Sequence, residues 1–253
     1  MIAAGFTWFH LIPAVDHDEL LAPLVHSHTY VHVLAWFACF VCIAFALAAR
    51  SGLERSRSRA GIERYFADER LTIRNFAELV VSGVRGFMSD VLEPADVRTF
   101  FPLVGGIFVY LLVCNFMGLI PGLLPPTDYI NTTFGIAAVV FLVFNFVGLK
   151  RDAVGYIKHL WGPVPLLGFL LFPIEVISLL FRPFSLTLRI TGNMFGDHTV
   201  FSIASSLVPV VVPALLMVLA VLVSVIQAFI FALLTSIYIS LSLPHHEGDE
   251  AHH

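Results

Sequence analysis

The sequence predicts an all-α membrane protein, and its composition and charge distribution both lead to this prediction. Of its 253 residues, 58% are hydrophobic and only 13% are charged, with a mean hydropathy of +0.89. Soluble domains carry about a quarter of their residues as Asp, Glu, Lys or Arg. Half that density cannot cover a globular surface in water, so most of the surface must face a lipid bilayer. The formal net charge of −4 gives no basic footprint for nucleic acid, and we expect no such partner.

The fourteen Lys and Arg residues are unevenly placed and set the expected topology. Three long stretches contain none of them: 1–49, 99–149 and 190–253. Because Lys and Arg accumulate in short cytoplasmic loops, the basic stretches 50–98 and 150–163 should both face the cytoplasm. We therefore expect residues 1–28 to form a tail on the opposite side and residues 244–253 to form a cytoplasmic tail.

The first 163 residues contain three apolar stretches long enough to cross a membrane, which takes roughly 20 helical residues. The first span is 29–49, which runs into the basic loop. The second and third spans form a hairpin over 99–149, with the proline-rich turn Pro121–Tyr129 between them. The chain then returns to the cytoplasm in the loop 150–163.

Residues 73–97, within the basic loop, carry apolar side chains at helical spacing with charged residues between them. Phe76, Val80, Val84 and Phe87 belong to this apolar set. The pattern suits an amphipathic helix that lies along the cytoplasmic interface. A connecting helix that packs on the same protein explains the pattern equally well.

The last spans, in 164–243, are unusually long. Thr199–Pro244 contains 46 residues without Asp, Glu, Lys, Arg or His. A helix from Pro213 to Leu243 would be about 46 Å long, half as long again as the hydrocarbon core is thick. We expect two long, steeply tilted helices that form a hairpin and bring the total to about five spans.

Only four formal charges lie between His159 and Pro244: Glu175, Arg182, Arg189 and Asp197. The first three are seven residues apart, close to two full helical turns, and therefore share one helix face. Ser178 lies near that face. Asn193 follows one turn beyond Arg189, and Asp197 or His198 extends the line by another turn.

Arg189 is the most informative of these charges. An arginine near mid-membrane costs at least about 2.5 kcal/mol, and it cannot lose its proton to relieve that cost. One interpretation is that Glu175 and Arg182 form an internal ion pair while Arg189 reaches an interface. However, no carboxylate lies one turn from Arg189 on its own helix, which favours a counter-ion from another chain.

Gln227 and His198 each have a structural and a functional interpretation. A lone glutamine in an apolar helix is commonly an interhelical hydrogen-bonding group, but Gln227 would also suit a conduction path. His198 could relay protons, since its ordinary pKa is near 6.5, or it could be a hydrogen-bonded residue at a helix end.

Four separated segments resemble the a subunit of F-type ATP synthases. The segment PFSLTLRITGNMFGDH (Pro183–His198) is similar to that family's signature, and IQAFIFALLTSIYISLSL (Ile226–Leu243) is similar to its C-terminal helix. INTTFGIA (Ile130–Ala137) and FPIEVISLLFRP (Phe172–Pro183) match in order and spacing. The resemblance covers most of the chain from about residue 75 onward.

The resemblance implies a stator subunit beside a rotating ring of c subunits, with two offset aqueous half-channels for protons. Arg189 matches the family's essential arginine, which faces the ring carboxylate. Asn193 and Gln227 match positions near that arginine. Glu175 and His198 match polar positions of the half-channel that opens away from the cytoplasm.

The sequence departs from the family at two positions. Ala220 stands where many members have an acidic residue or a histidine, with Ser224 one turn on, so a relay at that level must use Glu175, Asp197, His198 or water. Asp128 lies one place earlier than the family's acidic residue before INTT, and its role stays open.

The resemblance also implies the partners: the c ring, the peripheral-stalk b subunits and the remaining ATP synthase subunits, in a bacterial plasma (inner) membrane. No GxxxxGK[ST] loop is present, so we expect no nucleotide site, no cofactor and no enzymatic activity of the chain's own. We interpret Cys39 and Cys42, a CxxC in an apolar run, as small hydrophobic residues rather than as metal ligands.

Two other functions compete with this one. The first is a proton- or ion-coupled secondary transporter that uses Glu175, Arg182 and Arg189 for an anionic solute, although such transporters commonly have two repeated halves and no internal repeat is found here. The second is a membrane oxidoreductase subunit, which the scarcity of intramembrane histidine pairs disfavours.

Overall fold

The structure, a computed structural model, describes residues 29–57, 72–120, 123, 125–161, 165–207 and 211–243. This part of the chain folds into helices in the following order: α3 (Thr29–Arg57), α4 (Ile73–Ser89), α5 (Pro94–Met117), the 3-10 turn η3 (Pro126–Asp128), α6 (Ile130–Arg151), α7 (Ala153–Trp161), α8 (Pro165–Leu207) and α9 (Val211–Ser242). Among the described residues, five helices are long and apolar enough to cross a membrane, which confirms the predicted all-α membrane fold. They are α3, α5, α6, α8 and α9.

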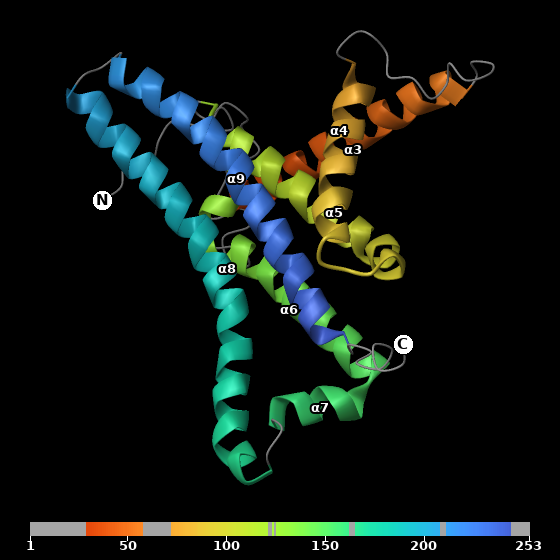
Figure 1. The fold of residues 1–253 in the computed structure, drawn as a ribbon. Helices are drawn as coiled ribbons and strands as arrows, with labels where there is room; N and C mark the ends of the chain where they lie inside the picture. Colours follow the sequence, from red (N-terminus) through yellow and green to blue (C-terminus); the bar gives the residue numbers. More distant parts are fainter. Residues whose placement is uncertain are drawn as a thin grey trace.

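The core of the protein lies where α5, α6, α8 and α9 meet (Figure 1). α5 packs mainly on α9, and α6 packs mainly on α8. Ala137 of α6 and Ala228 and Ala232 of α9 are fully buried there. Helices in a membrane associate through close packing, and small residues let their backbones approach each other. The packing of these four helices therefore fixes how α8 and α9 lie relative to each other.

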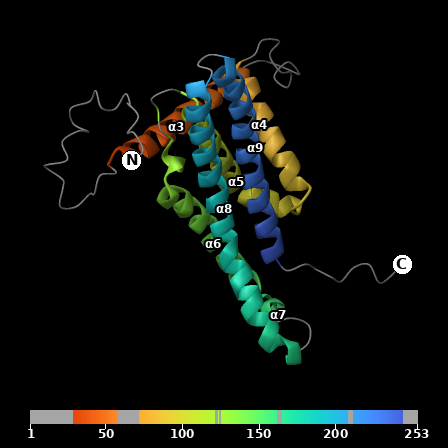
Figure 2. The same ribbon diagram turned by 90° about the vertical axis from the view of Figure 1, so that its left-hand side faces the viewer.

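α8 and α9 form the predicted long hairpin. They lie side by side over the upper part of the molecule in both ribbon views (Figures 1 and 2), and the turn between them, at 208–210, is outside the described residues. With 43 residues, α8 is about 65 Å long, roughly twice the thickness of the hydrocarbon core. It bends part-way along (Figure 1) and contains Pro173 and Pro183 in its interior, the residue type at which helices bend most often.

Serine and threonine hydroxyls in this core donate hydrogen bonds within their own helices. Thr187 donates to the carbonyl of Pro183 at 2.8 Å. On α9, Thr235 donates to the carbonyl of Phe231 at 2.9 Å and Ser236 to that of Ala232 at 3.0 Å. Each is a bond to the residue four places earlier, so the buried hydroxyls are satisfied without a partner helix.

Of the two interpretations offered for the amphipathic segment within 50–98, the structure shows packing on the same protein, and a position at the membrane interface stays a prediction. Helix α4 packs on α3 and α5, and its residues Val84 and Met88 are buried. Phe76 and Leu79 nevertheless remain exposed, as expected of a helix at a membrane interface. The helix ends at Ser89 rather than continuing to Val97, because α5 already begins at Pro94, a residue suited to the first turn of a helix.

A further helix, α7, occupies the stretch 150–163 that the sequence analysis treats as a loop. Asp152 starts it: the Asp152 carboxylate accepts a hydrogen bond from the backbone N–H of Gly155 at 2.9 Å. This is the usual geometry of an acidic residue that caps a helix N-terminus. The chain therefore turns at Asp152 and runs from α6 directly into α7.

The α5–α6 hairpin is fastened at its basic end by an ion pair, which we call the clasp. Arg151, at the end of α6, donates to both carboxylate oxygens of Asp96 in the first turn of α5. The Asp96 side chain is 7% exposed and that of Arg151 is 41% exposed. Nearby, a Cβ on Gly148 would lie 2.9 Å from the carbonyl oxygen of Ser242. α6 and α9 are thus packed here as closely as their backbones allow.

Candidate functional site

Arg182 is the first of the two membrane arginines on α8, and its partners belong to its own chain. Its guanidinium lies 4.0 Å from the carboxylate of Glu175. It also lies 5.1 Å from the ring centre of Tyr238 on α9 and 5.9 Å from that of Phe144 on α6, which are cation–π distances. The internal ion pair considered from the sequence is therefore present for Glu175 and Arg182.

Tyr156 of α7 extends this group of polar residues toward the basic end. Its hydroxyl donates to the side-chain oxygen of Asn145 on α6 at 2.7 Å. Burial raises the pKa of Tyr156 above its ordinary value, and the nearby Glu175 carboxylate also raises it, whereas Arg182 acts to lower it. The phenol therefore stays neutral at physiological pH and remains a hydrogen-bond donor.

Arg189 has a different environment. It is partly buried at the edge of the stripe by which α8 enters the core, between exposed Leu188 and buried Ile190. Within the part of the chain that the structure describes, no hydrogen bond or ion pair joins Arg189 to another residue. Gly192, one turn along, has no other atom within 4 Å of the position of an added Cβ. The surface of α8 is therefore open at Gly192, one turn from Arg189.

One turn beyond Arg189, a pair of amides connects α8 to α9. The side-chain nitrogen of Asn193 donates to the side-chain oxygen of Gln227 at 2.8 Å. Gln227 is buried, whereas Asn193 is exposed. The structure thus brings together two residues that are 34 positions apart in the sequence and that were both predicted to lie near the arginine.

Sequence reasoning missed a third amide, Asn115 on α5. Its side-chain nitrogen donates to the backbone carbonyl of Ser224 on α9 at 3.0 Å, and its side chain is buried. A signal was available, because Asn115 is an isolated amide in the apolar run between Cys114 and Phe116. Polar residues in membrane spans commonly form interhelical hydrogen bonds, as this one does.

Glu175 and His198 are expected from the sequence to line the same half-channel, and the structure shows how far apart they lie along α8. Both lie on the single helix α8, 23 residues apart, which corresponds to about 35 Å along its axis. Because α8 is long and bends part-way along, this axial separation is larger than the difference in depth, but it leads us to propose separate half-channels below. Glu175 lies on the α7 side of Arg189, and Asp197 and His198 lie on the opposite side. The spacing of these residues in the sequence predicts the helix face to which their side chains belong, but it does not predict their depth in the bilayer.

The structure also places the remaining predicted positions on α8 and α9. Ser178 and Asp197 are exposed on α8, and Ala220 is partly buried on α9. Ser224 is buried one turn before Gln227. The backbone of His198 belongs to α8, and its side chain is outside the described residues.

A comparison with protein families decides what kind of protein carries this arrangement. The model of the family described as "ATP synthase A chain" matches residues 32–240, most of the chain. The chain belongs to the ATP synthase A chain family. This membership agrees with the resemblance seen in the sequence motifs, and it sets aside the transporter and oxidoreductase alternatives.

Individual ATP synthase proteins are similar over most of this chain. "ATP synthase subunit a" of Bdellovibrio bacteriovorus is 34% identical over 95% of this chain and 99% of its own length. The protein of the same name in Geobacter sp. is 41% identical over 90% of this chain and 94% of its own. "ATP synthase subunit a 3" of Pelobacter propionicus is 48% identical over 71% and 76%, respectively.

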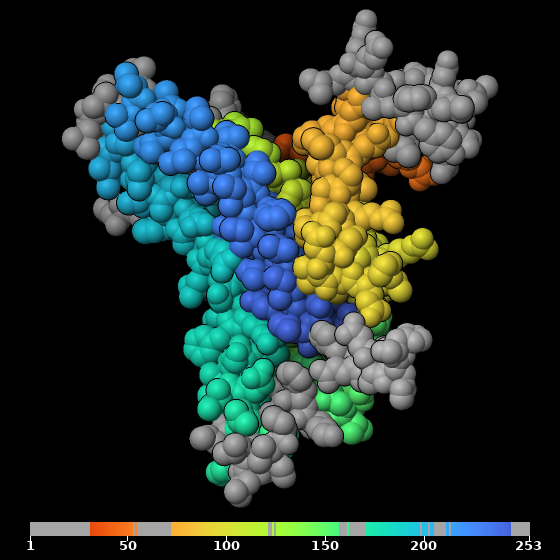
Figure 3. All heavy atoms as spheres, in the orientation of Figure 1, coloured from red at the N-terminus to blue at the C-terminus, as the bar shows by residue number. Residues whose placement is uncertain are grey.

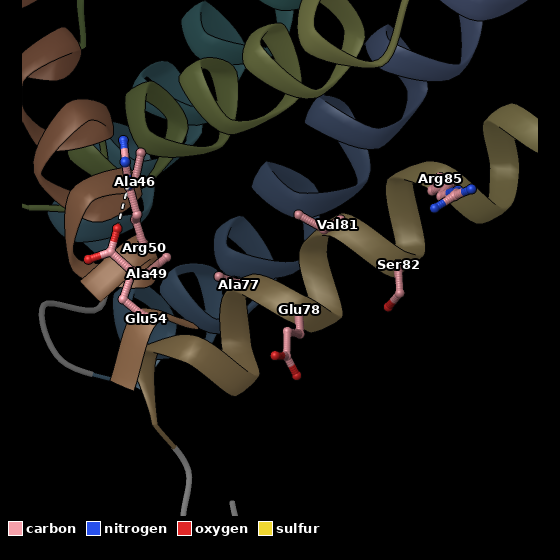
Figure 4. Close-up of a pocket in the computed structure, with 9 residues that line it drawn as sticks. All are labelled: Ala46, Ala49, Arg50, Glu54, Ala77, Glu78, Val81, Ser82 and Arg85. Atoms are coloured by element: carbon pink, nitrogen blue, oxygen red, sulfur yellow. Dashed lines mark hydrogen bonds and ion pairs between the residues drawn. The ribbon is translucent and has the colours of Figure 1, made fainter. Parts of the chain in front are cut away.

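Two other features of the chain, a pair of cysteines on α3 and a crevice between α3 and α4, are not part of the group of residues around Arg189. Cys39 and Cys42 are half-buried free thiols, and the described residues hold no group of three potential metal ligands. A crevice of about 770 Å³ opens between α3 and α4 (Figure 4) and is lined only by those two helices. Its acidic residues are already paired, Glu54 with Arg50 at 3.1 Å and Glu78 with Arg74 at 2.7 Å.

Proposed function

We propose that Arg189 separates two proton half-channels and faces the carboxylates of a rotating c ring. As a member of the ATP synthase A chain family, the chain is a proton-translocating subunit of the membrane sector and has no nucleotide site of its own. The observation that carries the proposal is the contrast between the arginines of α8. Arg182 is neutralised within the chain, whereas Arg189, seven residues on, has no partner among the described residues.

An unpaired guanidinium at this place has two electrostatic effects. It repels protons, because like charges interact strongly in a low dielectric, and so it blocks direct flow between the half-channels. It also lowers the pKa of a carboxylate that approaches it, so that the carboxylate releases its proton on one side. Reprotonation from the other side lets the carboxylate enter the lipid. Each charge that crosses gains about 2.3 kcal/mol per 100 mV of membrane potential.

The polar residues fall on two sides of Arg189, which supports one half-channel on each side. On the α7 side, we assign Glu175 and Ser178, with Arg182 as a secondary residue. On the opposite side, we assign Asp197 and His198. Asn193, Gln227 and Ser224 lie between these sets, near the level of the arginine.

The surface next to Arg189 supports contact with a helical partner. α8 and α9 lie at the surface along the face shown in Figure 3. The exposed residues Ser185, Leu188, Gly192 and Phe195 recur at helical spacing on α8. Because small residues let another helix approach closely, we assign this stripe to the c ring. We place the b subunits and the other ATP synthase subunits around the remaining surface.

The positive-inside rule supports an orientation in the bacterial plasma (inner) membrane. Lys150 and Arg151 at the end of α6 mark the cytoplasmic side. α7 and the Glu175 half-channel would then open to the cytoplasm, as would the C-terminus. The N-terminus and the turn between α8 and α9 would lie on the other side.

The test is Arg189→Ala in the assembled ATP synthase, with Arg182→Gln as the matched control. We expect Arg189→Ala to abolish proton-driven ATP synthesis in membrane vesicles while the complex still assembles. Arg182→Gln should keep a measurable rate, because its charge is already compensated by Glu175. Normal coupling of ATP hydrolysis to proton pumping in the Arg189→Ala complex would refute the gate assignment.

A further inference from the structure

Two buried side-chain atoms between α5 and α9 have no hydrogen-bond partner in the described structure. They are the side-chain oxygen of Asn115 and the side-chain nitrogen of Gln227. Asn115 is 4% exposed and Gln227 is 6% exposed. Buried polar atoms are nearly always hydrogen-bonded, because an unmade bond leaves their desolvation uncompensated. These two atoms therefore require an explanation.

The two atoms are chemically complementary, and both belong to side chains near Ser224 on α9. The nitrogen of Asn115 is fixed by its 3.0 Å bond to the carbonyl of Ser224, which places this side chain against α9. Gln227 follows Ser224 by three residues, and side chains at that spacing are neighbours on a helix, with about 5–6 Å between their Cβ atoms. The free oxygen of Asn115 accepts a hydrogen bond and the free nitrogen of Gln227 donates one. A single water molecule between them can do both.

We infer that Asn115 is a positioning residue for Gln227, acting through its bond to the Ser224 carbonyl and through a water molecule shared with the Gln227 amide. The bond to Ser224 fixes the rotation of α9 about its axis. The water fixes which end of the Gln227 amide faces α5, so that the oxygen faces Asn193 on α8. Three helices are thereby joined into one polar chain that ends one turn from Arg189.

This arrangement explains why Gln227 can meet Asn193 although it is surrounded by apolar residues. An amide has two chemically different ends, and only the oxygen can accept the 2.8 Å bond from the Asn193 nitrogen. Without a partner on α5, nothing in the described core would favour that orientation over its reverse. Asn115 also supplies a buried polar group near the level at which Ala220 replaces the usual one.

The test is a double-mutant cycle in the assembled ATP synthase, and its readout rests on the proposed function. Asn115→Leu, Gln227→Leu and the double variant are compared by ATP-driven proton pumping in inverted vesicles, per assembled complex. We expect Asn115→Leu to slow pumping about fivefold to tenfold, the effect of one lost hydrogen bond. The double variant should be no slower than the slower single variant, because Asn115 is inferred to affect pumping only through the position of the Gln227 amide. Losses that multiply would overturn the inference, as would normal pumping by Asn115→Leu.

Asn145→Leu is the matched control, because Asn145 is also a partly buried amide that bonds a neighbouring helix. Its partners are Tyr156 on α7 and the Phe141 carbonyl, not α9. The fold-reductions in pumping rate caused by Asn145→Leu and by Gln227→Leu should multiply in their double variant, because the two residues act independently. If Asn115→Leu prevents assembly, Asn115→Ser takes its place in the same cycle, since it keeps a polar group but lacks the second arm of the amide.

A cross-linking experiment tests the inference without relying on proton transport. Cysteines replace Asn193 and Gln227 in a chain whose own three cysteines are changed to alanine, and a short bifunctional thiol reagent is applied to the assembled complex. We expect the cross-link to form several times more slowly when Asn115→Leu is added, because α9 is then free to rotate. Equal rates would overturn the role of Asn115 and leave the Arg189 assignment intact.

Discussion

Arg151 and Arg189 are both arginines on membrane helices, and the structure treats them in opposite ways. Arg151 is held by both oxygens of Asp96 where the backbones of α6 and α9 are in close contact at Gly148. Arg189 has no partner among the described residues and lies beside Gly192, which has open space around it. The comparison teaches that packing and pairing go together. Arg151, which stabilises the fold, has its counter-ion in the same chain, whereas the guanidinium of Arg189, unpaired among the described residues, is the one that we assign to an exchangeable partner.

The largest effect is expected when Arg189 is given a carboxylate partner on its own helix. Asn193→Asp places one four residues along α8, within reach of the guanidinium. We expect proton pumping to fall at least about tenfold below that of Asn193→Ala, because an ion pair in a low dielectric is worth more than 1.4 kcal/mol. Asn193→Ala is the control, since it removes the bond to Gln227 without adding charge. Equal rates for the two variants would show that the freedom of Arg189 is unimportant.

The opposite change removes the counter-ion from the clasp. Asp96→Asn should lower the free energy of unfolding by about 1–3 kcal/mol, because Asp96 is buried and Arg151 would lose its partner. The measurement is the melting temperature of the detergent-solubilised complex. The double variant Asp96→Leu/Arg151→Leu should lose less, since it leaves no uncompensated charge. A double variant that is less stable than the single one would show that the clasp does not act as a charge pair.

The close packing near the clasp can be tested separately from its charges. Gly148→Ala should destabilise the chain by about 1–3 kcal/mol, because the new Cβ would lie 2.9 Å from the Ser242 carbonyl oxygen. Gly135→Ala, on the same helix but with no atom within 4 Å of the new Cβ, is the matched control. It should be neutral or slightly stabilising, since alanine favours a helix. The same thermal measurement compares them, and equal melting temperatures would contradict the close contact.

The smallest effect concerns Tyr156, which joins α7 to α6. Tyr156→Phe should cost about 1 kcal/mol through loss of the bond to Asn145. The raised pKa means that the folded protein holds this proton more tightly than the unfolded chain does. Its contribution is therefore complete below the ordinary tyrosine pKa of about 10 and is lost as the pH rises toward the folded value. Thermal melts from neutral to strongly alkaline pH should show a steeper loss of stability for the wild type than for Tyr156→Phe.

The spans, and the lack of an ion pair at Arg189 among the described residues, could be predicted because each depends on a quantity that the sequence contains directly. Apolar length predicts a membrane helix, and an arginine without a nearby carboxylate predicts an external partner. The pair Asn193–Gln227 was predicted only as two neighbours of the arginine. Their hydrogen bond depends on the packing of α8 against α9, which no local pattern specifies.

Three features of the structure could not be predicted from the sequence, each for a different physical reason. Asn115 acts through a backbone carbonyl of another helix, an acceptor that every residue carries and that no motif marks. α7 is too short for its periodicity to stand out, although Asp152 offered a capping signal. The depths of Glu175 and His198 in the membrane could not be predicted, because helical periodicity gives the direction of a side chain and not its position across the bilayer.

The hydroxyls that bond back within their own helices bear on how this protein is made. Thr187, Thr235 and Ser236 are already satisfied in an isolated helix, so α8 and α9 can each enter the bilayer from the insertion machinery without waiting for one another. The bonds that need two helices, from Asn115 and Asn193, can form only afterwards. We therefore expect two stages in membrane insertion. The helices enter the lipid with their own hydroxyls already hydrogen-bonded, and the amide hydrogen bonds between helices form afterwards, only when the helices pack in the correct register.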